Sequence, residues 1–270
     1  MNGEERIIKM LGYTQKPSEY MIEIFRNNIH SRNEFNIQYR WFCQYFEHSI
    51  ELIQLLLIDI EINKISTDIQ SKLQLSFMSE ILELFLSSYI DLMDKRYSCS
   101  FIIDRSIFES IVRSIWISYN PNDYMWVLPN LEADKDKKIK RFNFSKFLED
   151  QNIDTNLIFR YLSFHVHWNT INTSLKWWKD IWYTNPLRPE NLNQMHIEWS
   201  INMIQFLTFL TLYFIWKTLY KKWIHKSNLN TTLDVFENIL IKWGCWVNPE
   251  NPFSENIQQF KKLITMGNIS

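Results

Sequence analysis

The residues of this chain best suited to chemistry lie between positions 158 and 169, where an arginine, a serine and two histidines interrupt an aromatic run. On a helix with 3.6 residues per turn, positions seven apart differ by about 20° in rotation, so Arg160, Ser163 and His167 share a face. His165 is rotated from Arg160 by about 140° and points elsewhere. Because an imidazole titrates near neutral pH and a guanidinium stays charged, Arg160 and His167 form the candidate catalytic pair, and Ser163 is placed to orient the imidazole.

A second set of charged residues, Arg105, Glu109 and Arg113, recurs every four positions on a segment rich in isoleucine and phenylalanine. Side chains four apart are neighbours on a helix, and an exposed ion pair of this kind contributes about 0.2–0.5 kcal/mol. In partly buried surroundings the pairing becomes obligatory. Two interpretations stay open, because these residues either brace the helices or face a cleft, and we include Arg105 and Glu109 in the candidate catalytic site.

The histidine spacing does not indicate a metal site. His165 and His167 are two positions apart, which separates them by about 160° on a helix, so they cannot bind one ion together unless the helix breaks there. His196 and Glu198 share that spacing. Helical bundles that hold two metals carry paired Glu-x-x-His motifs, and this sequence has none. We therefore expect neither a metal nor a cofactor.

The distribution of glycine and proline predicts long helices. No glycine occurs between Tyr13 and Trp243, and residues 18–120 and 190–248 contain no proline. Tight hairpins and phosphate-binding loops need residues that adopt positive φ freely. Nucleotide binding through the glycine-rich loop of a Rossmann or P-loop fold is therefore excluded. The sequence predicts an all-α fold, a multi-helix bundle of about eight helices in a single domain over residues 1–270, with a possible exposed break at 120–140.

Apolar residues recur at steps of three and four along most of the chain, as amphipathic helices require. The predicted buried stripes include Leu57 in one helix and Leu75 and Leu82 in the next. The acidic residues of this second helix, Asp94 among them, are expected on solvated faces, because carboxylates are seldom buried. The first expected helix starts at Ser18 and either ends near Asn28 or continues past Asn33 into the next segment. The other expected helices are residues 34–61, 71–95, 101–119, 142–150, 156–172, 199–216, 231–243 and 254–266.

Residues 199–216 carry no charge, and this length meets the minimum for a membrane span. Polar residues along the stretch, such as Ser200, Gln205 and Thr208, argue against that interpretation, and no second comparable stretch exists. A central helix buried on all sides has the same composition. The core helix is the favoured interpretation and the membrane span is the alternative.

Charge and cysteine content limit the classes of function. With 29 basic and 30 acidic residues the net charge is -1. The protein therefore lacks the overall positive potential that a dedicated duplex-DNA-binding protein has. The basic cluster at residues 135–141 is either a solvated helix start or a patch that attracts a phosphate backbone. The three cysteines are far apart without CxxC spacing, and the first residues show no secretory signal, so a cytoplasmic location is expected.

Two short motifs resemble those of a bacterial all-helical family known only as a domain of unknown function. The first is Arg105-x-x-x-Glu109, and the second is Leu162-Ser163-x-x-Val166-His167, within roughly residues 34–178. This resemblance implies a helical fold and assigns no activity.

The segment that begins at Arg160 is also similar to the R-x(4-6)-H pattern of the HEPN (higher eukaryotes and prokaryotes nucleotide-binding) superfamily, with His165 or His167 as the histidine. That superfamily includes metal-independent ribonucleases that act as toxins and antiviral effectors. The resemblance implies that His167 takes the proton of the RNA 2′-hydroxyl, that Arg160 stabilises the charge on phosphorus, and that the protein forms a homo-oligomer. RNA, or a protein partner within a defence or toxin system, would then be the binding partner.

A non-catalytic alternative remains open for the same residues. Arg160, Ser163 and His167 can join Arg105 and Glu109 in a polar network that holds two helices in register. The runner-up class of function is a helical scaffold that binds a protein partner through its aromatic C-terminal half.

Overall fold

The computed structural model describes residues 19–62, 69–120, 143–158, 161–162, 194–219, 238, 240–242, 247 and 250–266. Regular secondary structure within these residues is helical throughout and includes no strand, which confirms the predicted all-α fold. The helices are α2 (Glu19–Gln38), α3 (Arg40–Ile62), α4 (Ile69–Met93), α5 (Tyr97–Tyr119), α6 (Phe144–Asp150), α8 (Gln194–Phe214), the π-helix η2 (Ile215–Leu219) and α10 (Ser254–Met266).

The first helix continues past Asn33, which is one of the two alternatives that the sequence leaves open, and the boundary between α2 and α3 lies at Tyr39. Only this one residue interrupts the helical backbone, because the Tyr39 amide still donates to the Phe35 carbonyl and the Tyr39 carbonyl accepts from the amides of Phe42 and Cys43. Helical hydrogen bonds therefore continue across the joint, which explains why periodicity alone does not locate it.

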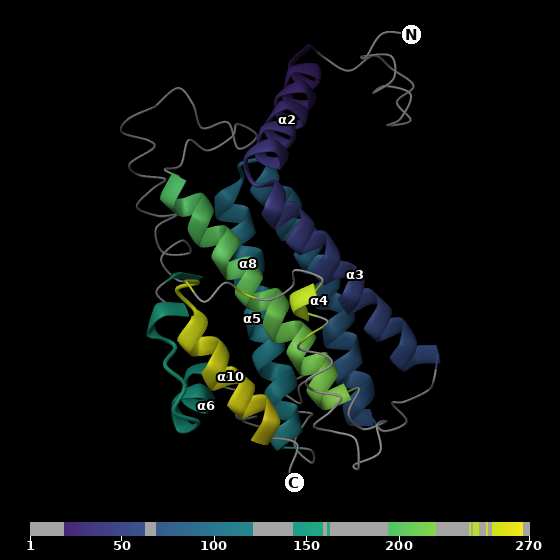
Figure 1. Cartoon of the computed structure of the whole chain (residues 1–270), viewed down its shortest axis with the longest axis vertical. Coiled ribbons are helices and arrows are strands. Elements are labelled where there is room, and N and C mark those ends of the chain that lie inside the picture. Colours follow the sequence, from purple (N-terminus) through teal and green to yellow (C-terminus); the bar gives the residue numbers. More distant parts are fainter. Residues whose placement is uncertain are drawn as a thin grey trace, which may run out of the picture.

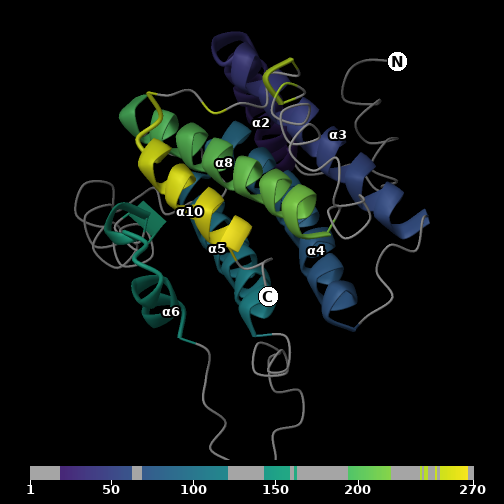
Figure 2. The same ribbon diagram turned by 60° about the horizontal axis from the view of Figure 1, so that its bottom comes forward.

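Helix α8 lies in the middle of the bundle and contacts α3, α4, α5 and α10 (Figures 1 and 2). Among the described residues, Ile197–Leu219 is the one helical stretch long and apolar enough to cross a membrane, and 83% of its most apolar window is buried inside the bundle. The Thr208 and Thr211 hydroxyls donate to the carbonyls of Ile204 and Leu207, four residues earlier. Both threonine hydroxyls thus find hydrogen-bond acceptors within the helix itself.

Helices α4 and α5 form an antiparallel hairpin whose turn is fixed by α2. Lys95 adopts a left-handed conformation with φ of 59°, and the preceding Asp94 is buried. The expectation that Asp94 faces solvent is wrong, because its carboxylate accepts two hydrogen bonds from Arg32, at 2.5 and 2.8 Å, and a third from Arg96 at 3.2 Å. Ser31 on α2 also donates to the Met93 carbonyl, so α2 holds the hairpin at its turn.

Candidate functional site

The candidate catalytic pair lies outside the described residues. Arg160, Ser163, His165 and His167 are not among them, whereas the residue next to Arg160, Tyr161, is described. Tyr161 and the helices that surround it are the described part of this region.

The segment before Tyr161 is held by α10. Helix begins at Asn156, as predicted, because the Asp154 carboxylate accepts a hydrogen bond from the Asn156 amide at 2.9 Å and caps the first turn. The Asp154 backbone is bonded in turn to two side chains of α10, since its amide donates to Gln259 at 3.2 Å and its carbonyl accepts from Asn256. Helix α10 thus holds the chain at Asp154, just before this helix begins.

Tyr161 is anchored among three aromatic rings from different parts of the chain. Its ring stacks on Trp199 of α8 with centroids 5.5 Å apart, and meets Phe101 of α5 edge-on at 4.9 Å and Phe253 edge-on at 6.1 Å. Its hydroxyl donates to Ser200 at 3.4 Å, and burial is the main cause of the raised pKa of this phenol. The backbone next to Arg160 is therefore attached to the bundle core.

Beside Tyr161 lies a buried carboxyl, Asp104, that the sequence motifs do not single out. Asp104 is completely buried on α5, and its Oδ1 accepts a short hydrogen bond of 2.6 Å from Ser88 of α4, which also pairs with Ser100 at 2.8 Å. Its Oδ2 has no hydrogen-bond partner within the described residues. Burial raises the pKa of Asp104 to about 7, although the Ser88 hydrogen bond opposes this shift.

A signal for Asp104 does exist in the sequence. Asp104 follows Phe101 by three positions and precedes Phe108 by four, so all three lie on one helical face, and both phenylalanines are fully buried. An aspartate on such a face is a burial anomaly, because carboxylates are almost never buried without a charged partner.

Arg105, Glu109 and Arg113 lie on the outer part of α5. The Arg105 Nε atom is 3.0 Å from Glu109 Oε1, and an Arg113 nitrogen is 3.8 Å from Glu109 Oε2. Their side chains are 37%, 24% and 31% exposed. The Arg113 guanidinium also lies over the Phe144 ring of α6, 5.1 Å from its centroid, so Arg113 links α5 to α6. Arg105, at the other end of this row of charged residues, stays accessible to solvent.

The contact between Phe101 and Tyr161 brings Tyr161 against α5. Phe101 lies one helical turn before Arg105 on α5, and Tyr161 directly follows Arg160. The start of the R-x(4-6)-H segment therefore packs beside the helix that carries Arg105 and Glu109, although about fifty residues separate them in the sequence.

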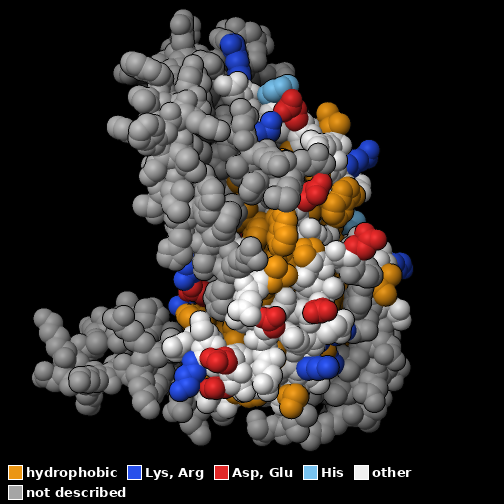
Figure 3. Space-filling model, turned by 90° about the vertical axis from the view of Figure 1, so that its left-hand side faces the viewer, with side chains coloured by type: hydrophobic (Ala, Val, Ile, Leu, Met, Phe, Trp, Pro, Cys, Tyr) orange, Lys and Arg blue, Asp and Glu red, His pale blue; other side chains and the backbone are white. Residues whose placement is uncertain are grey.

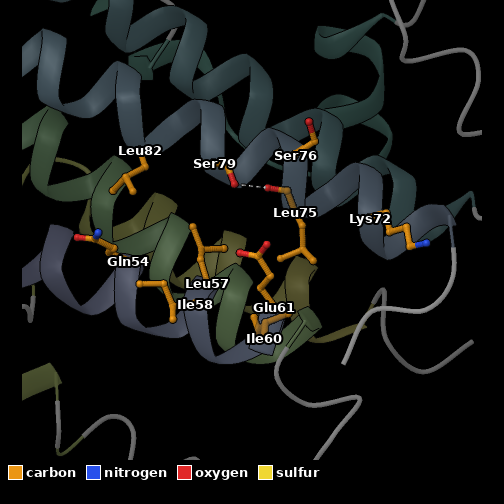
Figure 4. Close-up of a pocket in the computed structure, with 10 residues that line it drawn as sticks. All are labelled: Gln54, Leu57, Ile58, Ile60, Glu61, Lys72, Leu75, Ser76, Ser79 and Leu82. Carbon is orange, nitrogen blue, oxygen red and sulfur yellow. Dashed lines mark hydrogen bonds between the residues drawn. The ribbon is translucent and has the colours of Figure 1, made fainter. Parts of the chain in front are cut away.

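A groove of about 810 Å³ opens between α3 and α4 (Figure 4). Leu57, Leu75 and Leu82, which belong to the predicted core stripes, are only partly buried because they line this groove. Figure 4 shows Glu61 reaching between the two helices near Leu75, whereas Lys72 extends away from them. Within the described residues Glu61 forms no ion pair, so the groove combines apolar walls with an available carboxylate.

The charges of the described residues are mixed on the face shown in Figure 3. Acidic and basic side chains lie near one another there, and apolar side chains gather near the middle of the face. Neither sign of charge forms a continuous track among the residues coloured in that view. Any contact with a polyanion on this part of the molecule would therefore be local.

Comparison with known proteins gives no relative for this chain: it matches no protein-family model, no curated protein and no solved structure at a significant level.

Proposed function

We propose that this protein is a HEPN-like, metal-independent ribonuclease that acts in the cytoplasm as a toxin or antiviral-defence effector. The observation that supports the proposal is the packing of Tyr161 on Phe101. It ties the start of the R-x(4-6)-H segment to α5, the helix of the Arg105-x-x-x-Glu109 motif. Tyr161, the residue after Arg160, thus lies against the helix that carries the motif of the other resemblance.

The proposed reaction assigns one role to each candidate residue. His167 removes the proton from the RNA 2′-hydroxyl, and the resulting oxygen attacks the adjacent phosphorus. Arg160 stabilises the negative charge on the phosphoryl oxygens, and Ser163 orients the imidazole. The bond to the 5′-oxygen breaks, that oxygen takes up a proton, and a 2′,3′-cyclic phosphate remains.

Arg105 and Glu109 have supporting roles in this proposal. Arg105 is 37% exposed and is held by Glu109, so its guanidinium can contact a phosphate of the RNA backbone outside the reacting bond. Such a contact contributes to RNA affinity more than to the chemical step.

Single substitutions test the proposed catalytic pair. Arg160→Ala and His167→Ala should each lower the rate of cleavage of a structured RNA by a factor of about 10² or more, because each removes a group used in the transition state. His165→Ala serves as the matched control, since it removes an imidazole from another face of the helix and should have a milder effect. Cleavage is measured with EDTA present, and thermal unfolding is measured on the same samples.

Loss of activity counts only if folding is retained. Variants that melt like the parent protein and fail to cleave support catalysis. A parent protein that cleaves no RNA, together with Arg105→Ala, Glu109→Ala and His167→Ala variants that all melt earlier, would favour the non-catalytic polar network instead.

A second candidate function, a scaffold for a protein partner, is favoured by the groove between α3 and α4. The groove is lined over several turns of both helices, and its walls present Leu57, Ile58, Leu75 and Leu82. These features suit an amphipathic helix of a partner protein, with apolar residues at i, i+3, i+4 and i+7. Because the Glu61 carboxylate reaches into the groove, that helix should carry a lysine or arginine at the corresponding end.

Site-specific photo-crosslinking in cells tests the scaffold function. A crosslinker placed at Ser79 in the groove should capture a helical peptide with this apolar spacing and a basic residue. Ile58→Asp should abolish the capture, whereas Ile102→Asp should not, because Ile102 is similarly exposed (47% against 43%) but lies on α5 outside the groove. Capture that survives Ile58→Asp would contradict a partner in the groove.

A further inference from the structure

The apolar side of the groove between α3 and α4 continues along α4 beyond the residues that line the groove. Ser76 and Ser79 line it from one side of α4. Further steps of four, three and four residues along the same side of this helix reach Glu83, Leu86 and Ile90. Both apolar residues at this end are exposed, by 45% and 39%. The groove therefore opens onto an apolar surface that extends along α4 by about two further turns.

The edge of α3 that borders the groove carries a row of carboxylates. Gln54, Ile58 and Glu61 line the groove from this edge (Figure 4). Steps of three and four residues back along the same edge reach Glu51 and Glu47, which are exposed like Glu61. Three glutamates thus follow one side of the groove over about four turns of α3.

The face formed by these two helices is acidic. Its charged side chains are those of Glu47, Glu51, Glu61, Glu83 and Lys72, all of them exposed. Within the described part of the chain none of the five forms an ion pair. Four negative charges and one positive charge therefore surround an apolar groove, and their field is available to a partner.

This charge argues against two possible occupants of the groove. A second copy of the chain, docked by the same face, would bring the four glutamates of each copy toward those of the other. A polyanion such as RNA would be repelled by the same carboxylates. The partner that the face fits is apolar on one side and positively charged beside it.

We propose that the α3–α4 face binds a cationic amphipathic helix, whose apolar stripe fills the groove and whose lysines or arginines lie on both flanks of that stripe. One flank faces the glutamates of α3, and the other faces Glu83 of α4. The face extends from Lys72 to Ile90, which is about 27 Å, so the helix has about 18 residues. This inference rests on the scaffold function proposed above, and it adds that charge along the whole groove selects the partner.

Two synthetic helical peptides of about 18 residues test the inference on the intact protein. Both carry leucine at i, i+3, i+4 and i+7 and alanine on the opposite side, and the flanks carry lysine in one peptide and glutamate in the other. Fluorescence anisotropy at low salt should show that the protein binds the lysine peptide about tenfold more tightly or better. Added salt should reduce this preference, because exposed charges are screened.

Charge reversal on the protein should reverse the preference. The double variant Glu51→Lys/Glu83→Lys should bind the lysine peptide about tenfold more weakly and the glutamate peptide more tightly than the parent protein does. Glu149→Lys is the matched control, because Glu149 is also exposed but lies on α6, outside this face. It should leave both affinities unchanged. Thermal unfolding of each variant verifies that the fold is retained.

Three results would overturn the inference. They are equal affinity for the two peptides or no binding of either, equal weakening by Glu149→Lys and by the double variant, and a dimer of the parent protein that Ile58→Asp converts to a monomer. In the last case a second copy occupies the groove.

The photo-crosslinking experiment at Ser79 separates this inference from the scaffold function. Captured helical segments without an excess of basic residues would overturn the inference and leave the scaffold function intact. Charge-dependent peptide binding in solution, with no capture in cells, would end the scaffold function and leave the chemistry of the face as inferred.

Discussion

At the residue scale, two buried aspartates on one helical hairpin have opposite environments. Asp94 accepts hydrogen bonds from two arginines, whereas Asp104 is bonded to Ser88 and has no charged partner within the described residues. Ionised Asp94 is therefore compensated, and ionised Asp104 is not. The two residues should respond in opposite ways to neutralisation.

Asp94→Asn should destabilise the protein. It removes the acceptor shared by Arg32 and Arg96, and the expected loss in the free energy of unfolding is about 1–3 kcal/mol. The loss should stay below that of a fully buried pair, because the two arginine side chains are 42% and 33% exposed. Urea denaturation at pH 7 measures the change, with the exposed Glu83→Gln as control. An unchanged urea midpoint would contradict a stabilising role for the hydrogen bonds from Arg32 and Arg96 to Asp94 at the α4–α5 turn.

Asp104→Asn should stabilise the whole protein at neutral and higher pH. Because folding raises the pKa of Asp104 from 3.8 to about 7, its contribution to stability is present below pH 3.8 and is lost as the pH rises toward 7. The variant does not undergo this loss, so its advantage over the parent protein should grow from pH 4.5 to pH 8 and reach about 1–3 kcal/mol. Denaturation curves at both pH values test this, and an equal difference at both would contradict it.

At the element scale, periodicity and helix breakers predict most of the helices. Glycine and proline are absent between residues 18 and 120, where the apolar periodicity predicts four helices, and the structure contains α2 to α5 there. The joint at Tyr39 could not be predicted, because helical hydrogen bonds cross it and no breaker marks it. The exposure of Leu57 and Leu82 could not be predicted either, because it depends on the separation of α3 from α4 and not on either sequence alone.

The same limit applies to the candidate site. Sequence spacing placed Arg105 and Glu109 as neighbours, and the structure confirms that contact at 3.0 Å. It could not place Tyr161 on Phe101, which is a tertiary contact between segments about sixty residues apart. Asp104 belongs to neither motif, and its distinctive property is that an acidic residue lies on an otherwise apolar face of a helix.

Helix α8 should be the most sensitive element to loss of packing. Phe206 is fully buried and lies 5.2 Å from the Phe253 ring and 6.0 Å from the Phe260 ring of α10. Phe206→Ala should therefore lower the free energy of unfolding by about 3–5 kcal/mol. Leu86→Ala on α4 is the control, because Leu86 is 45% exposed and should change stability by about 0.5 kcal/mol or less. Equal effects in both variants would contradict a central position for α8.

At the scale of the whole molecule, one contiguous apolar core includes residues from α2 to α10. The proposed ribonuclease adds a second copy of the chain, because a two-fold axis brings together two Arg160–His167 pairs from a single sequence. Light scattering of the purified protein should then give twice the chain mass of 33.0 kDa. A monomer that cleaves RNA at full rate would show that one pair suffices and would contradict the dimeric site.

The measurement that tests the central proposal most directly is the chemical identity of the RNA ends that the protein produces. If His167 and Arg160 promote attack by the 2′-hydroxyl, cleavage in EDTA should leave 2′,3′-cyclic phosphate and 5′-hydroxyl ends, and mass spectrometry of the fragments should find neither after incubation with His167→Ala. Fragments with 3′-hydroxyl ends, cleavage that EDTA abolishes, or RNA left intact by the parent protein would contradict it.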